Sequence, residues 1–351
     1  MSSPAGRELP PPPAGRSGWP WDAAGTQARP GPGDVSALPR ISIVTPSLDQ
    51  GRFLEEALRS VLLQGYPNLE YIVVDGGSCD DSVEIIRRYA PWLSAWVSEK
   101  DRGQSHAINK GWAVATGDLV AYLNSDDTYR PGALLRVAQA WAKRRDAVMV
   151  AGAIVATDER SLATGSPALP RLPGPAPLDL SIVDPEHWRL PQQSCFWSRA
   201  ALDRVGGQLR EDLHYTMDRE LMYRLCREGP VTLVDDVLAT YRFHAASKSV
   251  SAILAFHGED PKALSCCTWG GDDARRRRSQ VARWRLAQGH FKYARSVSSP
   301  LATLRHLSAA AWYRRGYLAR SGFYGIALDA FGLKAPLEAM GRRLRRRRAS
   351  G

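Results

Sequence analysis

Two adjacent carboxylates, Asp126 and Asp127, follow a short apolar segment near the middle of the chain. Residues 118–122 are predicted to form a buried strand, and residues 132–143 a helix that follows a proline. In open α/β sheets, ligands bind just beyond the carboxyl ends of the strands, so both side chains are placed to reach a metal ion and phosphate groups. An aspartate that caps the next helix is the simpler interpretation of the same residues.

Three more residues with useful chemistry lie at the ends of predicted elements. Asp75 closes a predicted strand and precedes two glycines, which permit a ligand to approach the backbone closely. Asp218 lies in the first turn of a predicted helix, where the helix dipole favours a carboxylate. His244 follows residues 231–240, which are predicted to form a pair of strands. Each residue also has an ordinary interpretation, as part of a turn, a helix end or a packed core, so none defines a site alone.

The elements that must position these side chains alternate along the chain. Strands are predicted from apolar runs over residues 41–46, 69–75, 95–98, 118–122, 147–150 and 191–197. Helices are predicted over residues 53–62, 106–115 and 132–143, and another is predicted to end at Tyr89. Ser78 and Asp81 are predicted to form a capping box at the start of the helix that ends at Tyr89. A repeated strand-helix order predicts an α/β fold with a mostly parallel sheet and helices on both faces.

The charge of this 351-residue chain is unevenly distributed. The net charge is +11, but residues 274–351 hold 19 Lys and Arg against two acidic residues, a net +17 that leaves −6 for residues 1–273. A basic segment of this kind is expected to meet phosphate, on lipid headgroups or on nucleic acid. No known nucleic-acid motif accompanies it, so nucleic acid is the less favoured partner.

Other features of the composition narrow the class of protein. No run of 18 apolar residues and no secretory signal pattern occurs in the sequence. The five cysteines form no C-x-x-C pair, which argues against a disulfide framework and a zinc site and favours the cytoplasm. The chain also lacks G-x-G-x-x-G after its first strand and the G-x-x-x-x-G-K-[ST] motif, the usual phosphate cradles of dinucleotide oxidoreductases and P-loop phosphotransferases.

Composition also divides the chain into three parts. Residues 1–39 are rich in Pro, Gly, Ser and Ala and are predicted to be a disordered leader. Residues 40–250 carry the alternating elements, with a Pro-rich loop over 167–177. Residues 251–351 are predicted to be a basic helical extension with a frayed Arg-rich end, which either lies on an anionic membrane or packs as a solvated helix.

Five segments in the same order resemble the family 2 glycosyltransferases, which have the GT-A fold. They read IVTPSLDQGRFLEEALRSVLLQGYPNLEYIVVDGGS, SEKDRGQSHAINKGWAVATGDLVAYLNSDDTYRPGAL, PQQSCFW, HYTMDREL and YRFHAASKS, and they lie within residues 41–249. The resemblance implies transfer of a sugar, with inversion, from a nucleotide-sugar to a hydroxyl of a polysaccharide or lipid-linked acceptor. It leaves residues 1–39 and the basic extension uncovered.

The resemblance also implies a role for particular residues of this sequence. Donor-binding residues would be Thr45, Pro46, Ser47, Asp75, Lys100, Asp101, Asn124 and Asp126, with a uridine nucleotide favoured because Asp75 would accept from the pyrimidine ring. Asp126 and His244 would hold Mg²⁺ or Mn²⁺, although the first carboxylate of the family's D-x-D motif is here Asn124. Asp218 would be the catalytic base, and Gln192, Gln193 and Trp197 would face the sugar or the acceptor.

Alternatives from other classes remain open at this stage. A sugar nucleotidyltransferase also combines an α/β sheet with acidic metal ligands, and it would release pyrophosphate. A binding protein that has lost turnover would explain Asn124 in the D-x-D position. For the favoured enzyme, we expect a cytoplasmic protein that associates peripherally with the inner face of the membrane through residues 274–351.

Overall fold

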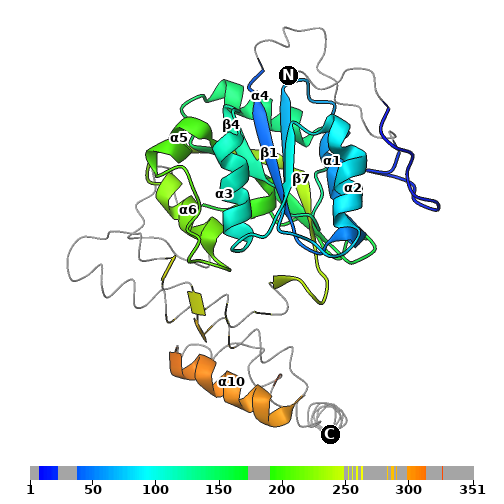
Figure 1. Ribbon diagram of the computed structural model, residues 1–351. Helices are drawn as coiled ribbons and strands as arrows, with labels where there is room; N and C mark the ends of the chain where they lie inside the picture. The colour runs from blue at the N-terminus through cyan, green and yellow to red at the C-terminus, as the bar shows by residue number, and fades with distance from the viewer. Residues whose placement is uncertain are drawn as a thin grey trace, which may run out of the picture. The chain divides into compact units, whose positions relative to one another are not determined.

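The structure is a computed structural model that describes residues 8–22, 38–172, 190–248 and 299–313, together with isolated positions between 252 and 326 (Figure 1). Its contacts divide the chain into two compact units, Met1–Ser247 and Lys248–Gly351. The arginine runs 275–278 and 342–348 of the basic extension, together with Cys266 and Cys267, lie outside the described residues. So does the second half of the predicted Pro-rich loop, from residue 173.

A seven-stranded, mostly parallel sheet forms the centre of the first unit. The strands are β1 (Ile41–Ser47), β2 (Leu69–Asp75), β3 (Ala95–Ser98), β4 (Leu119–Tyr122), β5 (Met149–Thr157), β6 (Cys195–Ser198) and β7 (Val231–Arg242). Their order is β3-β2-β1-β4-β6-β5-β7, and only β6 runs against its neighbours. The predicted α/β fold with a mostly parallel sheet is therefore confirmed.

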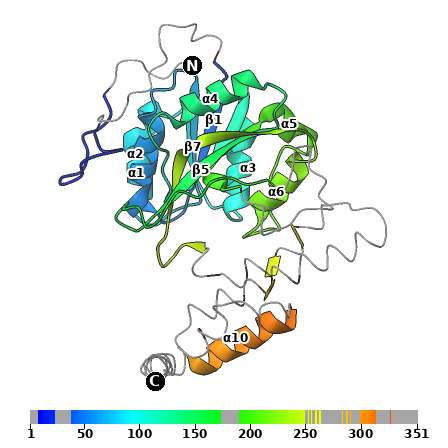
Figure 2. The same cartoon turned by 180° about the vertical axis from the view of Figure 1, so that it is seen from behind.

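Helices cover both faces of this sheet. They are α1 (Gly51–Leu62), α2 (Ser82–Tyr89), α3 (Gln104–Val114), α4 (Ala133–Lys143), α5 (Arg199–Arg204) and α6 (Met217–Leu225). Figures 1 and 2 show α1 and α2 side by side on one side of the sheet and α3 on the other. The buried faces of the helices follow their apolar spacing, as in α1, where Phe53, Leu54, Leu58 and Val61 are buried.

Four local expectations differ from the structure. Residues 231–242 form one long strand with bulges opposite β5, not a pair of strands. In the predicted strand 191–197, Gln192–Ser194 form a 3₁₀ turn and only Cys195–Trp197 are strand. The fifth strand begins two residues later than predicted and continues to Thr157. Ser78 does not form the predicted capping box, because its hydroxyl donates to Asp75 Oδ1 (2.5 Å).

Residues 8–22 differ from the disorder predicted for the leader, because they lie on α1 in defined contacts. The buried guanidinium of Arg59 donates to the carbonyl oxygens of Pro10 (2.7 Å), Pro20 (3.0 Å) and Trp21 (2.9 Å). Trp19 Nε1 donates to the carbonyl of Tyr129 (2.8 Å), which belongs to the loop after β4. One buried arginine thus satisfies three backbone acceptors of a segment that has little apolar surface of its own.

The second unit contains one helix that is described along its length, α10 (Pro300–Tyr313). Leu307 and Ala310 are buried, whereas Leu301, Leu304 and Trp312 are exposed. This helix lies within residues 251–351, which were predicted to be helical. Among the described residues, no helix is long and apolar enough to cross a membrane.

Candidate active site

The carboxyl ends of the parallel strands form the edge where the predicted site residues gather. Ser47, Asp75 and Ser98 close β1, β2 and β3, and the strand register places them opposite one another. β4 ends at Tyr122 and leads into the loop that carries Asp126 and Asp127. Residues separated by more than 70 positions in the sequence thus share one edge of the sheet.

Asp75 is fully buried at this edge and accepts several hydrogen bonds. Its Oδ2 accepts from Gly77 N (3.1 Å), Ser78 N (2.9 Å) and Ser98 Oγ (2.7 Å), whereas among the described residues its Oδ1 accepts only from Ser78 Oγ. Each carboxylate oxygen has two lone pairs, so Oδ1 retains one for a further donor. The side chain is therefore held rigidly and can still accept from a ligand.

Lys100 and Asp101 lie against the two glycines that follow Asp75. A Cβ atom at Gly76 would lie 2.7 Å from Asp101 Oδ2, and one at Gly77 would lie 3.3 Å from Lys100 N. Gly77 also has a φ of 87°, in the left-handed region that favours glycine. The structure therefore brings the predicted residues Asp75, Lys100 and Asp101 together, and the glycines make this approach sterically possible.

The three predicted donor residues of β1 differ in accessibility. Thr45 is fully buried, and its hydroxyl pairs with the Tyr71 hydroxyl (2.9 Å) inside the core. Pro46 and Ser47 follow at the strand end beside Val74 and Asp75. Among the described residues, Ser47 Oγ has no hydrogen-bond partner although it is buried. A buried hydroxyl without a partner is costly, so Ser47 is the residue of this strand best placed to bond a ligand.

The loop after β4 is held by hydrogen bonds to several elements. Gln104 Nε2, in the first turn of α3, donates to Asn124 Oδ1 (2.6 Å), and Asn124 Nδ2 donates to Asp127 Oδ2 (3.4 Å). Burial raises the pKa of the Asp127 carboxyl well above its usual range, and the neighbouring Asp126 carboxylate raises it further. Asn124 thus joins the loop to α3 and contacts the buried Asp127.

Asp126 and His244 meet across the site, although they lie more than 100 residues apart in the sequence. Asp126 Oδ2 and His244 Nε2 are 2.9 Å apart, the Asp126 side chain is 21% exposed and the imidazole is almost completely buried. The imidazole also packs against the Phe53 ring, with centroids 5.0 Å apart. The structure therefore brings together the two residues that were predicted to hold a divalent ion.

These two side chains have the chemistry to hold a divalent metal ion, and their 2.9 Å contact brings the two donor atoms together. Carboxylate oxygen and imidazole nitrogen are both ordinary ligands of divalent ions. Among the described residues, no group of three or more His, Cys, Asp and Glu side chains could hold a metal ion, so oxygen atoms of a ligand or water would complete the coordination.

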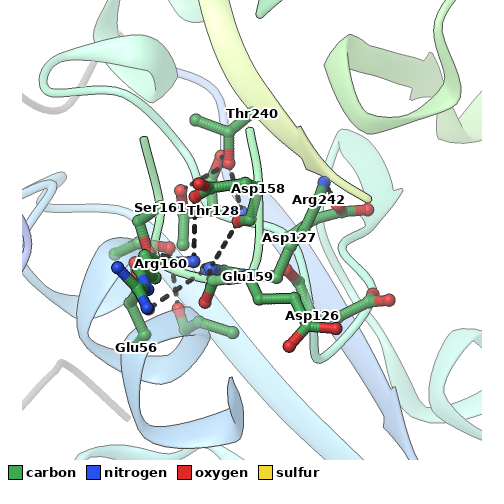
Figure 3. A network of polar contacts seen from close by, with 12 residues as sticks. Glu56, Asp126, Asp127, Thr128, Asp158, Glu159, Arg160, Ser161, Thr240 and Arg242 are labelled. Carbon is green, nitrogen blue, oxygen red and sulfur yellow. Dashed lines mark hydrogen bonds and ion pairs between the residues drawn. The ribbon is translucent and has the colours of Figure 1, made fainter. Parts of the chain in front are cut away.

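Arg242 lies two residues before His244 and contacts the same loop. It is 1% exposed, its Nε donates to the Asp126 carbonyl (2.7 Å), and its backbone N donates to Asp127 Oδ1 (2.9 Å). Figure 3 shows that its guanidinium also lies among Glu56 of α1 and the turn over residues 158–161. Sequence reasoning did not identify Arg242; an arginine two residues before His244, at the end of a predicted strand, was the available signal.

Asp218 approaches the same edge from the first turn of α6. Its Oδ1 accepts from the Arg219 backbone N (2.8 Å), and the side chain is partly buried. The pKa of the Tyr122 hydroxyl is raised, first by burial and then by the charges of Asp218, Cys195 and Asp127. Asp218 and Asp127 therefore both lie within electrostatic range of the residue that ends β4.

The three predicted acceptor residues contact the strand end and the core in different ways. Gln192 Nε2 donates to the carbonyl of Tyr122 (2.7 Å), and the Gln193 side chain hydrogen-bonds Asp127. Trp197 is fully buried, stacks on Tyr122 with centroids 5.7 Å apart and meets Trp112 at 5.6 Å. The expectation that Trp197 faces a ligand is not met, because the indole lies in the aromatic core between β4 and α3.

Comparisons with known sequences match this domain to sugar-transferring enzymes. Residues 42–205 match the model of glycosyl transferase family 2. An uncharacterized glycosyltransferase of Nostoc sp. is 28% identical over 233 residues, which cover 64% of this chain and 71% of that protein. A PGL/p-HBAD biosynthesis glycosyltransferase of Mycobacterium bovis is 32% identical over 123 residues, or 34% of this chain and 48% of the relative.

Solved structures share the fold. TarS residues 1–349 of S. aureus, in complex with UDP-GlcNAc, align with a TM-score of 0.56 and 14% identity, covering 86% of this chain and 92% of that one. The mannosyltransferase PcManGT of Pyrobaculum calidifontis, in complex with GDP-Man and Mn²⁺, aligns with a TM-score of 0.53 and 19% identity, covering 90% and 93%. At these identities the likeness concerns the fold alone.

Proposed function

Because the chain belongs to glycosyl transferase family 2, we propose that it transfers a sugar, with inversion, from a nucleotide-sugar to a hydroxyl group of a glycan or lipid-linked acceptor. The observation that carries the proposal is that Asp75 lies at the carboxyl end of β2 and that Asp126 of the loop after β4 meets His244, with Asp218 close enough to affect the pKa of Tyr122 at the end of β4. These side chains would bind a donor, hold its leaving diphosphate and deprotonate an acceptor.

A UDP-sugar is the donor that we propose. Asp75 Oδ1 retains a lone pair that would accept from the N–H of a uracil ring, and loss of such a bond leaves a buried polar group without a partner. Ser47 would bond the nucleoside through its unpartnered hydroxyl, with Thr45 and Pro46 shaping the strand behind it. Lys100 and Asp101 would border the nucleotide beside Gly76 and Gly77. TarS, a structural neighbour, is complexed with UDP-GlcNAc, whereas PcManGT is complexed with GDP-Man.

Asp126 and His244 would hold Mg²⁺ or Mn²⁺ next to the diphosphate. When bound, a divalent ion supplies positive charge that stabilises the departing diphosphate. The 2.9 Å separation of Asp126 Oδ2 and His244 Nε2 supports this role. Asn124 would contribute a hydrogen bond near the ribose, although its amide is already engaged with Gln104 and Asp127.

Asp218 would act as the base for the acceptor hydroxyl. Its carboxylate would accept the proton as the acceptor oxygen attacks the anomeric carbon and the bond to the diphosphate breaks. One displacement with one base inverts the configuration at that carbon, and the transition state would resemble an oxocarbenium ion. Gln192 hydrogen-bonds the Tyr122 carbonyl and Gln193 hydrogen-bonds the Asp127 side chain, so both would hold the backbone and carboxylate next to the proposed acceptor region.

A panel of nucleotide sugars with Mn²⁺ tests the proposal first. We expect hydrolysis or transfer that releases a nucleoside diphosphate, and release of pyrophosphate from a nucleoside triphosphate would instead indicate a nucleotidyltransferase. Asp218→Asn should keep UDP affinity within about twofold and lower kcat by roughly 10²- to 10⁴-fold. Asp203→Asn, at an exposed carboxylate of α5, is the matched control. Turnover by Asp218→Asn close to that of the control would remove Asp218 from this role.

We also propose that residues 274–351 bring this cytoplasmic enzyme to the inner face of an anionic membrane. The support is their net charge of +17, since each Lys or Arg near such a surface contributes about 1 kcal/mol. Flotation with vesicles that contain anionic lipid should recover the full chain and fail to recover a chain ending at Asp273. Equal recovery of both chains, or recovery that does not depend on anionic lipid, would contradict this proposal.

A further inference from the structure

We propose that Arg242 is a positioning residue for the divalent cation site, with Glu56 as the buried group that balances its charge. The inference rests on the proposed function, because it concerns the Asp126 and His244 ligands assigned there. Arg242 touches neither reacting group in this proposal. It would act by fixing the backbone that presents the Asp126 carboxylate to His244.

The end of β7 holds the Asp126 loop at three points. The Arg242 backbone N donates to Asp127 Oδ1 (2.9 Å), and the Arg242 Nε donates to the Asp126 carbonyl (2.7 Å). Two residues further on, His244 Nε2 meets Asp126 Oδ2 (2.9 Å). Because Arg242 and His244 both contact the Phe53 ring and the Asp126 loop, a displacement of Arg242 would change the distance between the two proposed metal ligands.

The other side of the guanidinium is anchored to two more elements (Figure 3). Its Nη1 donates to the carbonyl of Glu159 (3.2 Å) and to Ser161 Oγ (2.8 Å) in the turn after β5. Its Nη2 lies 3.1 Å from Glu56 Oε2 in α1, and Ser161 Oγ donates to Glu56 Oε1 (2.6 Å). These contacts use the planar fork of donors that arginine has and lysine lacks.

The positive charge of Arg242 is balanced by the carboxylate of Glu56. Arg242 and Glu56 are 1% and 6% exposed, and the guanidinium stacks over the Phe53 ring on which His244 also packs. A buried positive charge without Glu56 would repel a divalent ion bound by Asp126 and His244. The buried pair is therefore neutral as a whole, so it can hold the loop without opposing the cation.

The experiment compares binding of Mn²⁺, in the presence of saturating UDP, by wild type and by Arg242→Lys, using calorimetry. Lysine keeps the charge but cannot make the Nε, Nη1 and Nη2 contacts together. We expect Mn²⁺ affinity to fall roughly 10- to 100-fold, as is usual when groups that orient metal ligands are changed. UDP affinity without metal should stay within about twofold, because the Arg242 contacts found among the described residues go to Glu56, the Asp126 loop and the turn over 158–161 and not to Asp75.

Arg59→Lys is the matched control, because Arg59 is also a buried arginine that donates to three carbonyl groups, but those belong to the leader. A merely structural role for Arg242 predicts that both variants lose folding stability and keep Mn²⁺ affinity, and this result would overturn the proposal. If Arg242→Lys does not fold, Ser161→Gly removes one guanidinium contact at a residue whose φ is already 67°. We then expect a two- to fivefold loss of Mn²⁺ affinity, and unchanged affinity would overturn the proposal.

Binding by the wild type tells a failure of the Arg242 proposal apart from a failure of the proposed function. If wild type binds UDP and Mn²⁺ and Arg242→Lys binds both equally well, only the positioning role is wrong. If wild type binds neither, the proposed function fails, and the role of Arg242 fails with it.

Discussion

The contact between Arg59 and the leader makes a prediction about stability that can be worked out from the structure. In Arg59→Met, the carbonyls of Pro10, Pro20 and Trp21 lose a charged donor that the chain otherwise buries with them. Hydrogen bonds to charged groups contribute about 1.5–3 kcal/mol each. Part of this loss of free energy is offset, because the released leader regains conformational freedom and no charge has to be buried. We expect a net loss of about 2–4 kcal/mol in the free energy of unfolding.

A double-mutant cycle measures whether Arg59 acts through the leader. Urea denaturation would be followed for the full chain and for a chain lacking residues 1–22, each with and without Arg59→Met. In the truncated chain the substitution should cost less than about 1 kcal/mol, because its three carbonyl partners are absent. The coupling energy should therefore be about 2–3 kcal/mol.

Arg199→Met provides the control for this cycle. Arg199 also donates to main-chain carbonyls, those of Trp112 and Ala115, but both lie inside the α/β domain. Its cost should be the same with and without residues 1–22. If Arg59→Met costs the same in both chains within about 0.5 kcal/mol, the leader does not depend on Arg59 and the interpretation is wrong.

Three further predictions concern charge. Burial raises the pKa of Glu70, but hydrogen bonds from Ser42 and Thr116 and the charge of Arg40 outweigh it and hold the pKa below 4.5. A carboxyl whose pKa is lowered in the folded state stabilises the fold above its unfolded pKa, and this stabilisation is lost as the pH falls through the folded pKa. Glu70→Gln should therefore cost about 1–2 kcal/mol of the free energy of unfolding at pH 7 and little at pH 3, as measured by urea denaturation. Equal costs at the two pH values would contradict this. Asn124→Asp adds a carboxylate beside Asp126 and Asp127, and the repulsion should raise the pKa values of these carboxyl groups. Thermal unfolding should therefore show a larger loss of stability at pH 8 than at pH 5. A loss that does not depend on pH would contradict this prediction. EDTA should stop transfer and Mn²⁺ or Mg²⁺ should restore it, and full activity in EDTA would refute the metal role of Asp126 and His244.

Local features of the fold were predictable because they depend on residues close in sequence. The runs 41–46 and 69–75 are buried on both faces of a parallel sheet, so they appear as continuous apolar segments. Ser78 shows the limit of such reasoning. Its spacing suits a helix cap, but Asp75 lies closer and takes its hydroxyl, so the competing hydrogen bond decides the geometry.

Features that depend on distant residues were predicted less well. The meeting of Asp126 with His244 was expected only through resemblance to a family, because no local pattern joins residues so far apart. Arg242 was missed, since its partners come from α1, the loop after β4 and the turn after β5. The order of residues 8–22 was missed for a similar reason: composition counts apolar side chains, and here a single arginine on α1 satisfies the backbone.

The reversed direction of β6 has a consequence for how such an enzyme could diverge. Since β5 runs with the parallel strands and β6 runs against them, β5 ends and β6 begins at the same edge of the sheet, the one that bears Asp75 and Asp126. A chimaera that exchanges only residues 169–190 with a homologue would keep every strand and the contacts that Glu159 and Ser161 make with Arg242. Such chimaeras would test whether the chain between β5 and β6 affects the choice of acceptor while the proposed nucleotide site stays constant.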